Sequence, residues 1–336
     1  MQYIAKRFLS SMPALLIVIF LIFVLTRVMP GDPARMYAGE QATQEAVDKI
    51  RGELGLDKSY PEQFVDYVKG MTQGDFGYAW HTEHPVLEDF AQRFPASLEL
   101  ALTAILIAIL VGVPLGIVSA TNKNSLADHI SRIVSLAGAT MPVFWLGLML
   151  ILVFYAKLDI APAPMGRISN YINPPTAITG LYVLDSILTG DMVGLKSSLA
   201  QIALPAITLS VSSMAVIARM TRSSMLEVLS QDYVRTARAK GLKERVVVYR
   251  HAFTNTLIPV LTVLGSQFGY LLGYTVVVET IFAWPGIGSY VTDSIMVTDY
   301  APVQAFALLS AAVYVVINLT LDILYTVVDP RVKYDK

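Results

Sequence analysis

The chain has 336 residues, of which 54% are hydrophobic and only 15% are charged. Soluble globular domains carry roughly 25% charged residues, so this composition favours a membrane protein over a soluble one. The sequence contains no cysteine, which excludes disulfide bridges and thiolate metal sites as sources of stability or chemistry.

Taken in chain order, six uncharged apolar stretches are long enough to cross a hydrocarbon core, which needs about 20 helical residues. They cover residues 8–26, 100–122, 133–156, 197–218, 252–278 and 300–321. Lys6 and Arg7 precede the first stretch, but its apolar part is longer than that of a signal peptide and no small-residue cleavage pattern follows. We therefore predict an all-α membrane protein of six transmembrane helices that retains its first helix.

The distribution of basic residues predicts the orientation of these helices. If Lys6 and Arg7 are cytoplasmic, six crossings place 15 of the 25 Lys and Arg residues inside and nine outside, with Arg27 at the boundary. Six of the nine fall in the long segment 30–96, where charge has little influence on topology. Both termini are accordingly expected in the cytoplasm.

The external segments are expected to contain local structure. Segment 30–96 has a helix-like run at 45–54, and segment 157–196 is an irregular loop with short helices, interrupted by Pro and Gly. The predicted organisation is a first transmembrane helix with its external segment (1–96), a five-helix core (97–330) with a cytoplasmic loop at 219–256, and a cytoplasmic tail (331–336).

The most informative cytoplasmic stretch is 230–242. Asp232 is a good N-cap and Gly241 a good terminating residue, so a helix of about eight residues and ~12 Å is expected between them. Basic residues alternate there with small or apolar ones: Tyr233, Val234, Arg235, Ala237, Arg238, Ala239 and Lys240. Such a helix either docks in a groove of a soluble partner or lies flat on the membrane surface, and the residues alone leave both interpretations open.

This stretch resembles the cytoplasmic loop of ABC importer permeases, whose pattern is Glu-Ala-Ala, three residues, then Gly. Arg235-Thr236-Ala237 stands at the Glu-Ala-Ala position and Gly241 at the Gly, a departure typical of the peptide and nickel branch of the family. Further motifs similar to that branch lie at 30–33, 54–57, 74–77, 93–98, 220–227, 238–242, 251–259, 279–288, 299–300 and 329–331. The resemblance covers nearly the whole chain and is strongest to dipeptide permease B subunits.

The resemblance implies a pore subunit, not an enzyme, of an ATP-driven peptide importer in the bacterial cytoplasmic membrane. The implied partners are a homologous permease in a heterodimer, two cytoplasmic ATPase subunits and an extracytoplasmic peptide-binding protein. No nucleic-acid partner is expected, and no cofactor is expected in this chain, since ATP and Mg belong to the ATPases. The implied ATPase-coupling residues are Asp232, Tyr233, Arg235, Thr236, Ala237, Arg238, Ala239, Lys240, Gly241 and Leu242.

Two alternatives concern energy and cargo. The chain has no phosphate-binding G-x-x-x-x-G-K-[ST] loop, which fits a borrowed energy source, whereas Glu279 and Asp322 could instead relay protons in an ion-coupled transporter. Both carboxylates are expected near an interface, where snorkelling or helix capping would explain them. A peptide cargo is favoured over nickel because no predicted span contains histidine or cysteine, but nickel or another small solute stays open.

Two smaller features of the sequence are a glycine repeat and a pair of histidines. Gly265, Gly269 and Gly273 recur on one face of the fifth span, where small residues allow close helix packing in lipid, either within the subunit or against a partner permease. Gly112 and Gly116 repeat the spacing in the second span. His81 and His84 could suggest metal capture, but in a polar external loop we expect them to be solvated.

Overall fold

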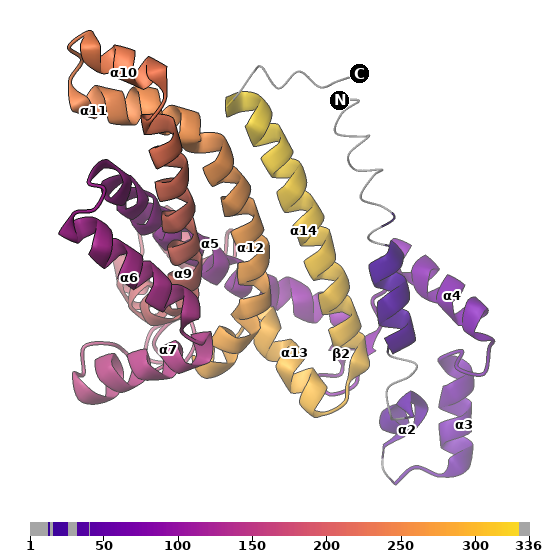
Figure 1. Cartoon of the computed structure of the whole chain (residues 1–336). Coiled ribbons are helices and arrows are strands. Elements are labelled where there is room, and N and C mark those ends of the chain that lie inside the picture. The colour runs from indigo at the N-terminus through magenta and orange to yellow at the C-terminus, as the bar shows by residue number, and fades with distance from the viewer. Residues whose placement is uncertain (1–12, 14–15, 26–31, 40, 329–336) are drawn as a thin grey trace. The chain divides into compact units, whose positions relative to one another are not determined.

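The computed structural model describes residues 13, 16–25, 32–39 and 41–328, and it is mostly helical (Figure 1). The predictions made for the first half of the first span and for the tail at 331–336 lie outside these residues. The chain divides into two compact units, residues 1–94 with 287–315 (unit 1) and residues 95–286 with 316–336 (unit 2). Two long helices, α5 (Val86–Thr121) and α14 (Tyr300–Val328), run through both units.

Unit 1 combines parts of α5 and α14 with short helices and one small hairpin. Its elements are α2 (Pro33–Ala38), α3 (Gln44–Glu53), α4 (Tyr60–Thr72), β1 (Tyr78–Ala79), β2 (His84–Pro85) and α13 (Ile287–Met296). The two strands are antiparallel, with Tyr78 opposite Pro85. Helix α3 confirms the predicted run at 45–54, and Thr43 begins it by accepting a bond from the Ala46 N–H.

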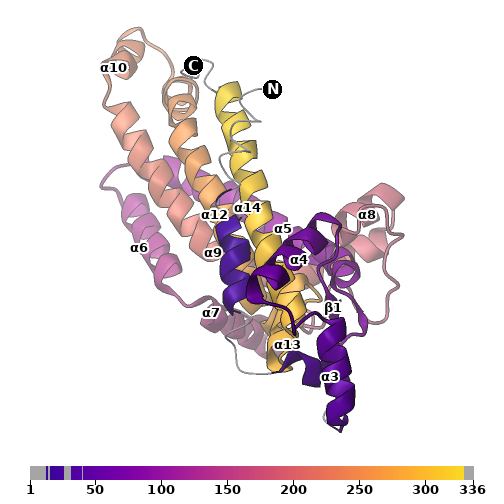
Figure 2. The ribbon, with the colours of Figure 1, turned by 90° about the vertical axis from the view of Figure 1, so that its right-hand side faces the viewer.

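Unit 2 is organised around one long helix. Besides parts of α5 and α14 it contains α6 (Leu126–Thr140), α7 (Val143–Leu150), η1 (Ile151–Lys157), α8 (Tyr182–Thr189), α9 (Met192–Leu229), α10 (Asp232–Ala239), α11 (Glu244–Val246), η2 (Val247–Phe253) and α12 (Thr254–Ile281). Helix α9 packs against α12, α6, α7 and α8. Figure 2 shows α8 near the start of α9 and α10 beyond its C-terminal end.

Within the described residues, four helical segments are long and apolar enough to cross a membrane, and a bent helix pair makes a fifth if it is counted as one span. The segments are Val86–Thr121, Met192–Leu229, Glu244–Ile281 and Tyr300–Leu321, and the pair is Leu126–Thr140 with Val143–Lys157. The described part of the first predicted span forms a shorter apolar helix, Leu16–Leu25. The fold is therefore that of a multi-pass helical membrane protein.

The predicted third span, 133–156, is not one straight helix. Helices α6 and α7 meet at an angle of 106°, with Met141 and Pro142 between them. Proline has no N–H to donate and its ring disfavours helical backbone at the preceding residue, so Met141 is extended, with φ −68° and ψ 128°. The apolar composition continues across a position where the helical hydrogen bonding must stop.

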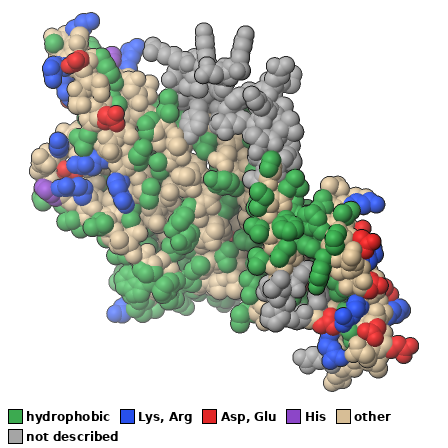
Figure 3. Space-filling view, turned by 45° about the vertical axis from the view of Figure 1, so that its right-hand side comes forward, with side chains coloured by type: hydrophobic (Ala, Val, Ile, Leu, Met, Phe, Trp, Pro, Cys, Tyr) green, Lys and Arg blue, Asp and Glu red, His purple; other side chains and the backbone are tan. Residues whose placement is uncertain are grey.

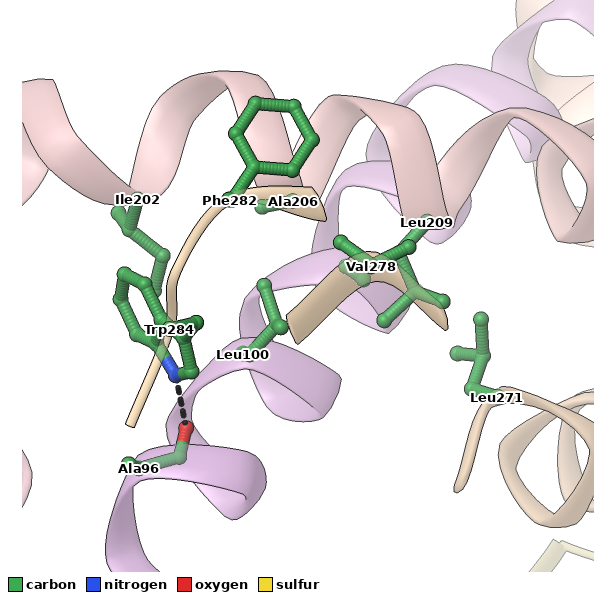
Figure 4. Close-up of a cluster of buried hydrophobic side chains, with 10 residues drawn as sticks. Ala96, Leu100, Ile202, Ala206, Leu209, Leu271, Val278, Phe282 and Trp284 are labelled. Carbon is green, nitrogen blue, oxygen red and sulfur yellow. Dashed lines mark hydrogen bonds between the residues drawn. The ribbon is translucent and has the colours of Figure 1, made fainter. Parts of the chain in front are cut away.

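The core of unit 2 joins α5, α9 and α12. Leu100, Ile202 and Leu271 are almost fully buried there beside Trp284, whose indole Nε1–H donates to the Ala96 carbonyl at 2.9 Å (Figure 4). Where α5 crosses α9 the backbones approach closely, since a Cβ on Gly116 would lie 2.7 Å from the Ala218 carbonyl oxygen. Residues without a side chain are required at such crossings.

Candidate functional site

The candidate site is α10, a helix of eight residues between α9 and the short α11. A helix this short is not stable in water by itself, so its position depends on packing. Val234 and Ala237, three residues apart, point inward and form a small apolar cluster with Val247 of η2. Burial of a valine side chain stabilises by about 1.5–3 kcal/mol. One turn of apolar contact therefore fixes α10 on the end of α9.

The helix begins one residue earlier than the sequence predicts. Its N-cap is Gln231, and Asp232, expected to be the N-cap, is the first helical residue. The correction is small because the Asp232 carboxylate remains in the first turn, where a negative charge interacts favourably with the helix dipole.

The C-terminus of α10 forms the predicted glycine stop. Gly241 has φ +73°, its N–H donates to the Arg238 carbonyl at 2.9 Å, and the Leu242 N–H donates to the Ala237 carbonyl at 3.4 Å. These two bonds form a Schellman motif, which ends a helix with a left-handed residue. A Cβ at Gly241 would meet no atom within 4 Å. The requirement for glycine here is thus conformational and not a matter of space.

The outer face of α10 is exposed and basic. Its exposed residues are Asp232, Tyr233, Arg235, Thr236, Arg238, Ala239 and Lys240, followed by Gly241 and Leu242. The Arg238 guanidinium donates to both carboxylate oxygens of Glu244, at 2.7 and 3.1 Å, which ties α10 to the start of α11. Tyr233 and Leu242 add exposed apolar surface. The result is a projecting surface that combines positive charge with apolar contact area.

A buried polar cluster lies beneath this end of unit 2, and sequence reasoning did not find it. Asp128 of α6 is fully buried and accepts hydrogen bonds from Arg222 of α9 at 2.8 and 3.0 Å and from the Ser119 hydroxyl of α5 at 2.6 Å. The cluster joins α5, α6 and α9, and α9 is the helix that leads into α10. Arg222 lies 94 residues from Asp128 and 103 from Ser119 in the sequence, and no local sequence pattern indicates contacts over such distances.

Glu279, one of the two carboxylates considered for a proton relay, is fully buried at the end of α12. It accepts a bond from the Ser97 hydroxyl at 2.6 Å and does not snorkel towards water. The side chain of Asp322 lies outside the described residues.

The other site predictions concern glycines of α12. Gly265 is buried, and a Cβ there would overlap Leu321 of α14, whereas Gly273 is exposed and a Cβ there would meet no atom within 4 Å. Gly269 lies between them and is partly buried. One end of the glycine face is therefore occupied within the subunit and the other end is open.

The two external histidines differ from each other in unit 1. His81 is largely buried, and its Nδ1 lies 2.8 Å from Oδ2 of Asp299, so the expectation that it is solvated is wrong. His84 is exposed, with its Nδ1 3.8 Å from Oδ1 of Asp89. The partner of His81 lies 218 residues away in sequence, which explains why composition did not reveal it.

The fold defines a multi-pass helical membrane protein that carries a short, exposed basic helix after α9. Comparison of the sequence with known protein families gives the same class. The family described as binding-protein-dependent transport system inner membrane component matches residues 112–334, and its N-terminal companion matches residues 1–101. The chain belongs to this family and is a multi-pass protein of the bacterial inner membrane.

Three relatives illustrate the similarity. The chain is 45% identical to the probable D,D-dipeptide transport system permease protein DdpB of Escherichia coli, over 92% of this chain and 91% of that protein. It is 43% identical to the dipeptide transport system permease protein DppB of Alkalihalophilus pseudofirmus, over 99% and 100%. It is 38% identical to the glutathione transport system permease protein GsiC of E. coli, over 99% of each chain.

Proposed function

We propose that this chain is the permease subunit of an ATP-driven importer for di- and oligopeptides. It forms the translocation pathway as a heterodimer with a homologous permease. Two ATPase subunits bind on the cytoplasmic side, bringing ATP and Mg, and an extracytoplasmic peptide-binding protein delivers the cargo. Relatives named as dipeptide and glutathione permeases, matched over nearly their whole length, support the peptide class of cargo.

The single observation that carries the coupling role is the construction of α10. Its inner face is buried against α9 and η2, its outer face is basic and exposed, and a Schellman motif fixes its end. A helix whose inner face is packed on the membrane helices and whose outer face binds a soluble subunit can transmit conformational change between the two. We assign docking on the ATPase to residues 232–242, and close packing against the partner permease to the open end of the Gly265–Gly269–Gly273 face.

The proposed topology has six spans with both termini in the cytoplasm, a five-helix core at 97–330, and the loop 219–256 inside. The distribution of basic residues supports it, because eight of them lie between Arg219 and Arg250. Single cysteines at Asn173 and Lys243, labelled with an impermeant thiol reagent in intact cells, test it. Labelling at Asn173 but not Lys243 is expected, and the reverse pattern would refute the orientation.

The coupling role is tested at Gly241. A left-handed backbone costs an ordinary L-residue roughly 1–2 kcal/mol and is worse for a β-branched side chain, whereas asparagine tolerates it. Gly241→Val should leave the complex assembled but lower peptide-dependent ATP hydrolysis and uptake about tenfold or more. Gly241→Asn, the matched control, should retain most of both. Because no atom lies near the new Cβ, crowding cannot explain a difference between the two variants.

The cargo is tested with the same reconstituted complex, by comparing uptake of labelled dipeptide with uptake of labelled nickel. Peptide uptake that requires the ATPase subunits supports the proposal. Nickel uptake without peptide uptake would reassign the cargo. Uptake that continues without ATPase subunits but follows a proton gradient would favour an ion-coupled transporter, in which Glu279 would be the first carboxylate to replace.

A further inference from the structure

A small basic pocket lies between α6 and α9, apart from the coupling helix. Ser131, Arg132 and Ser135 of α6 and Arg219 and Arg222 of α9 line a cavity of about 290 Å³. This volume is near the lower end of the roughly 300–1,000 Å³ typical of ligand pockets.

The charges around the pocket do not balance. Arg222 is neutralised by the buried Asp128, at 2.8 and 3.0 Å. Arg132 is paired less closely with the same carboxylate, since its Nε lies 3.8 Å from Oδ1 of Asp128. Its Nη2 lies 2.6 Å from Nδ1 of His129. Arg219 is exposed, and among the described residues it has no hydrogen-bond or ion-pair partner. Three guanidinium groups thus face one carboxylate, which leaves the pocket with excess positive charge.

Two serines supply neutral donors beside these arginines. Ser131 and Ser135 lie one turn apart on α6 and are each only 8% exposed, and their hydroxyls form no hydrogen bond with any described residue. Ser210 of α9 donates its hydroxyl to a backbone carbonyl of the preceding turn, whereas Ser198 and Ser213 of α9, like Ser131 and Ser135, have no hydroxyl partner among the described residues but do not line a basic pocket. Partly desolvated hydroxyls left unused beside guanidinium groups suit an anion with several acceptor oxygens.

The position and surroundings of the pocket indicate what carries that anion. Arg132 directly precedes the third apolar stretch and Arg219 directly follows the fourth, so the pocket lies at the proposed cytoplasmic boundary of the membrane. On α6, Ile130, Ile133 and Leu136 expose 52%, 67% and 63% of their surfaces. Figure 3 shows Lys and Arg side chains gathered on this side of the molecule, with hydrophobic side chains spread below them. A basic pocket that could contact a lipid headgroup is thus adjacent to an exposed apolar face of α6 that could contact acyl chains.

We propose that this pocket binds the headgroup phosphate of an anionic phospholipid of the cytoplasmic leaflet. Arg219 and Arg132 contact the phosphate, the two serine hydroxyls donate to it, and the acyl chains lie along the exposed face of α6. Basic pockets between transmembrane helices on the cytoplasmic side are known lipid-headgroup sites in general. A bound lipid there would hold α6 and α9 together just before the chain enters α10.

The test uses the full chain with its partner subunits, purified from nanodiscs with equal phosphatidylglycerol and phosphatidylcholine. Phospholipid retained after mild delipidation is measured by mass spectrometry. The wild type should retain phosphatidylglycerol in preference to phosphatidylcholine. Arg219→Gln should lower that preference roughly fivefold, as expected for one basic contact. Ser135→Val, which keeps the charge, should lower the amount of phosphatidylglycerol retained roughly threefold, because one hydrogen bond to the phosphate is lost.

Lys123→Gln is the matched control, because Lys123 is an exposed basic residue of the turn between α5 and α6 and does not line the pocket. It should retain phosphatidylglycerol like the wild type. Excess inorganic phosphate should not displace the lipid. Absence of preference in the wild type, an equal loss in Lys123→Gln, unchanged retention in Arg219→Gln, or displacement by inorganic phosphate would each overturn the lipid assignment.

Discussion

The segment around α8 and the segment around α10 lie near opposite ends of α9 and use charged residues in opposite ways. Near α8, Glu99 and Arg167 are 4% and 7% exposed, and each also bonds a backbone group, Val183 N–H and the Gly180 carbonyl respectively. At α10, Arg238 pairs with Glu244 in solvent. The first arrangement fixes a loop in one conformation. The second leaves charges available to another molecule.

The buried pair joins three segments that are distant in sequence. The Arg167 guanidinium donates to Glu99 at 2.6 and 3.2 Å and lies 3.7 Å from the ring centre of Tyr182. A pair with these additional hydrogen bonds and a cation–π contact compensates the desolvation of both charges. The loop after η1, the start of α8 and the middle of α5 are thereby held together.

The largest expected effect is for Arg167→Ala. Loss of one partner leaves the Glu99 charge buried and uncompensated, so the free energy of unfolding should fall by about 3–5 kcal/mol. The measurement is thermal unfolding of the purified complex in detergent. Lys196→Ala, which removes an exposed basic residue of the same segment, is the control and should change little. If both variants melt alike, the contrast between the two segments fails.

The second prediction concerns Asp185, a buried carboxylate of α8. It accepts the backbone N–H groups of Ile178, Thr179 and Gly180 and the Thr179 hydroxyl, at 2.7–3.2 Å. Burial raises its pKa, but these hydrogen bonds outweigh burial and hold the pKa below the ordinary value. A lowered folded-state pKa contributes stability above the unfolded value of about 3.9, and that stability is lost as the pH falls through the folded value.

Asp185→Asn should therefore cost about 1.5–3 kcal/mol at neutral pH, the usual worth of hydrogen bonds to a charged group. The difference from the wild type should shrink as the pH drops below about 4. Unfolding midpoints at neutral and acidic pH measure both. Asp159→Asn is the control, since Asp159 is exposed and forms no hydrogen bond among the described residues. A difference that does not depend on pH would show that the charge of Asp185 is not responsible.

The two segments also differ in how well the sequence predicted them. The end of α10 at Gly241 depends on local backbone conformation, and the sequence predicted it correctly. The start was misplaced by one residue, because both Gln231 and Asp232 can occupy a helix end. The break at Pro142 was visible in the sequence, but continuous apolar composition outweighed the missing N–H donor in the prediction.

Contacts between distant segments could not be predicted. Glu99 and Arg167 are 68 residues apart, and His81 and Asp299 are 218 apart. Single-sequence patterns report helical faces and ends, whereas these pairs depend on how whole segments pack. The composition and charge asymmetry nevertheless led to a multi-pass membrane fold, and the order of the motifs led to the correct family.

The smallest effect is expected for Arg238→Ala, the matched counterpart of Arg167→Ala. The Arg238–Glu244 pair has similar hydrogen-bond geometry to the buried pair, with distances of 2.7 and 3.1 Å, but its side chains are 43% and 59% exposed. Water and salt screen such a pair, so its loss should cost at most about 1 kcal/mol. A double-mutant cycle with Glu244→Gln, run at low and high salt, should give a coupling energy that nearly vanishes at high salt.

A cost comparable to that of Arg167→Ala would mean that α10 is held by this ion pair and not by the apolar contacts of Val234 and Ala237. With the expected small cost, loss of ATPase coupling in the same variant would point to its exposed charge, because the fold would be intact.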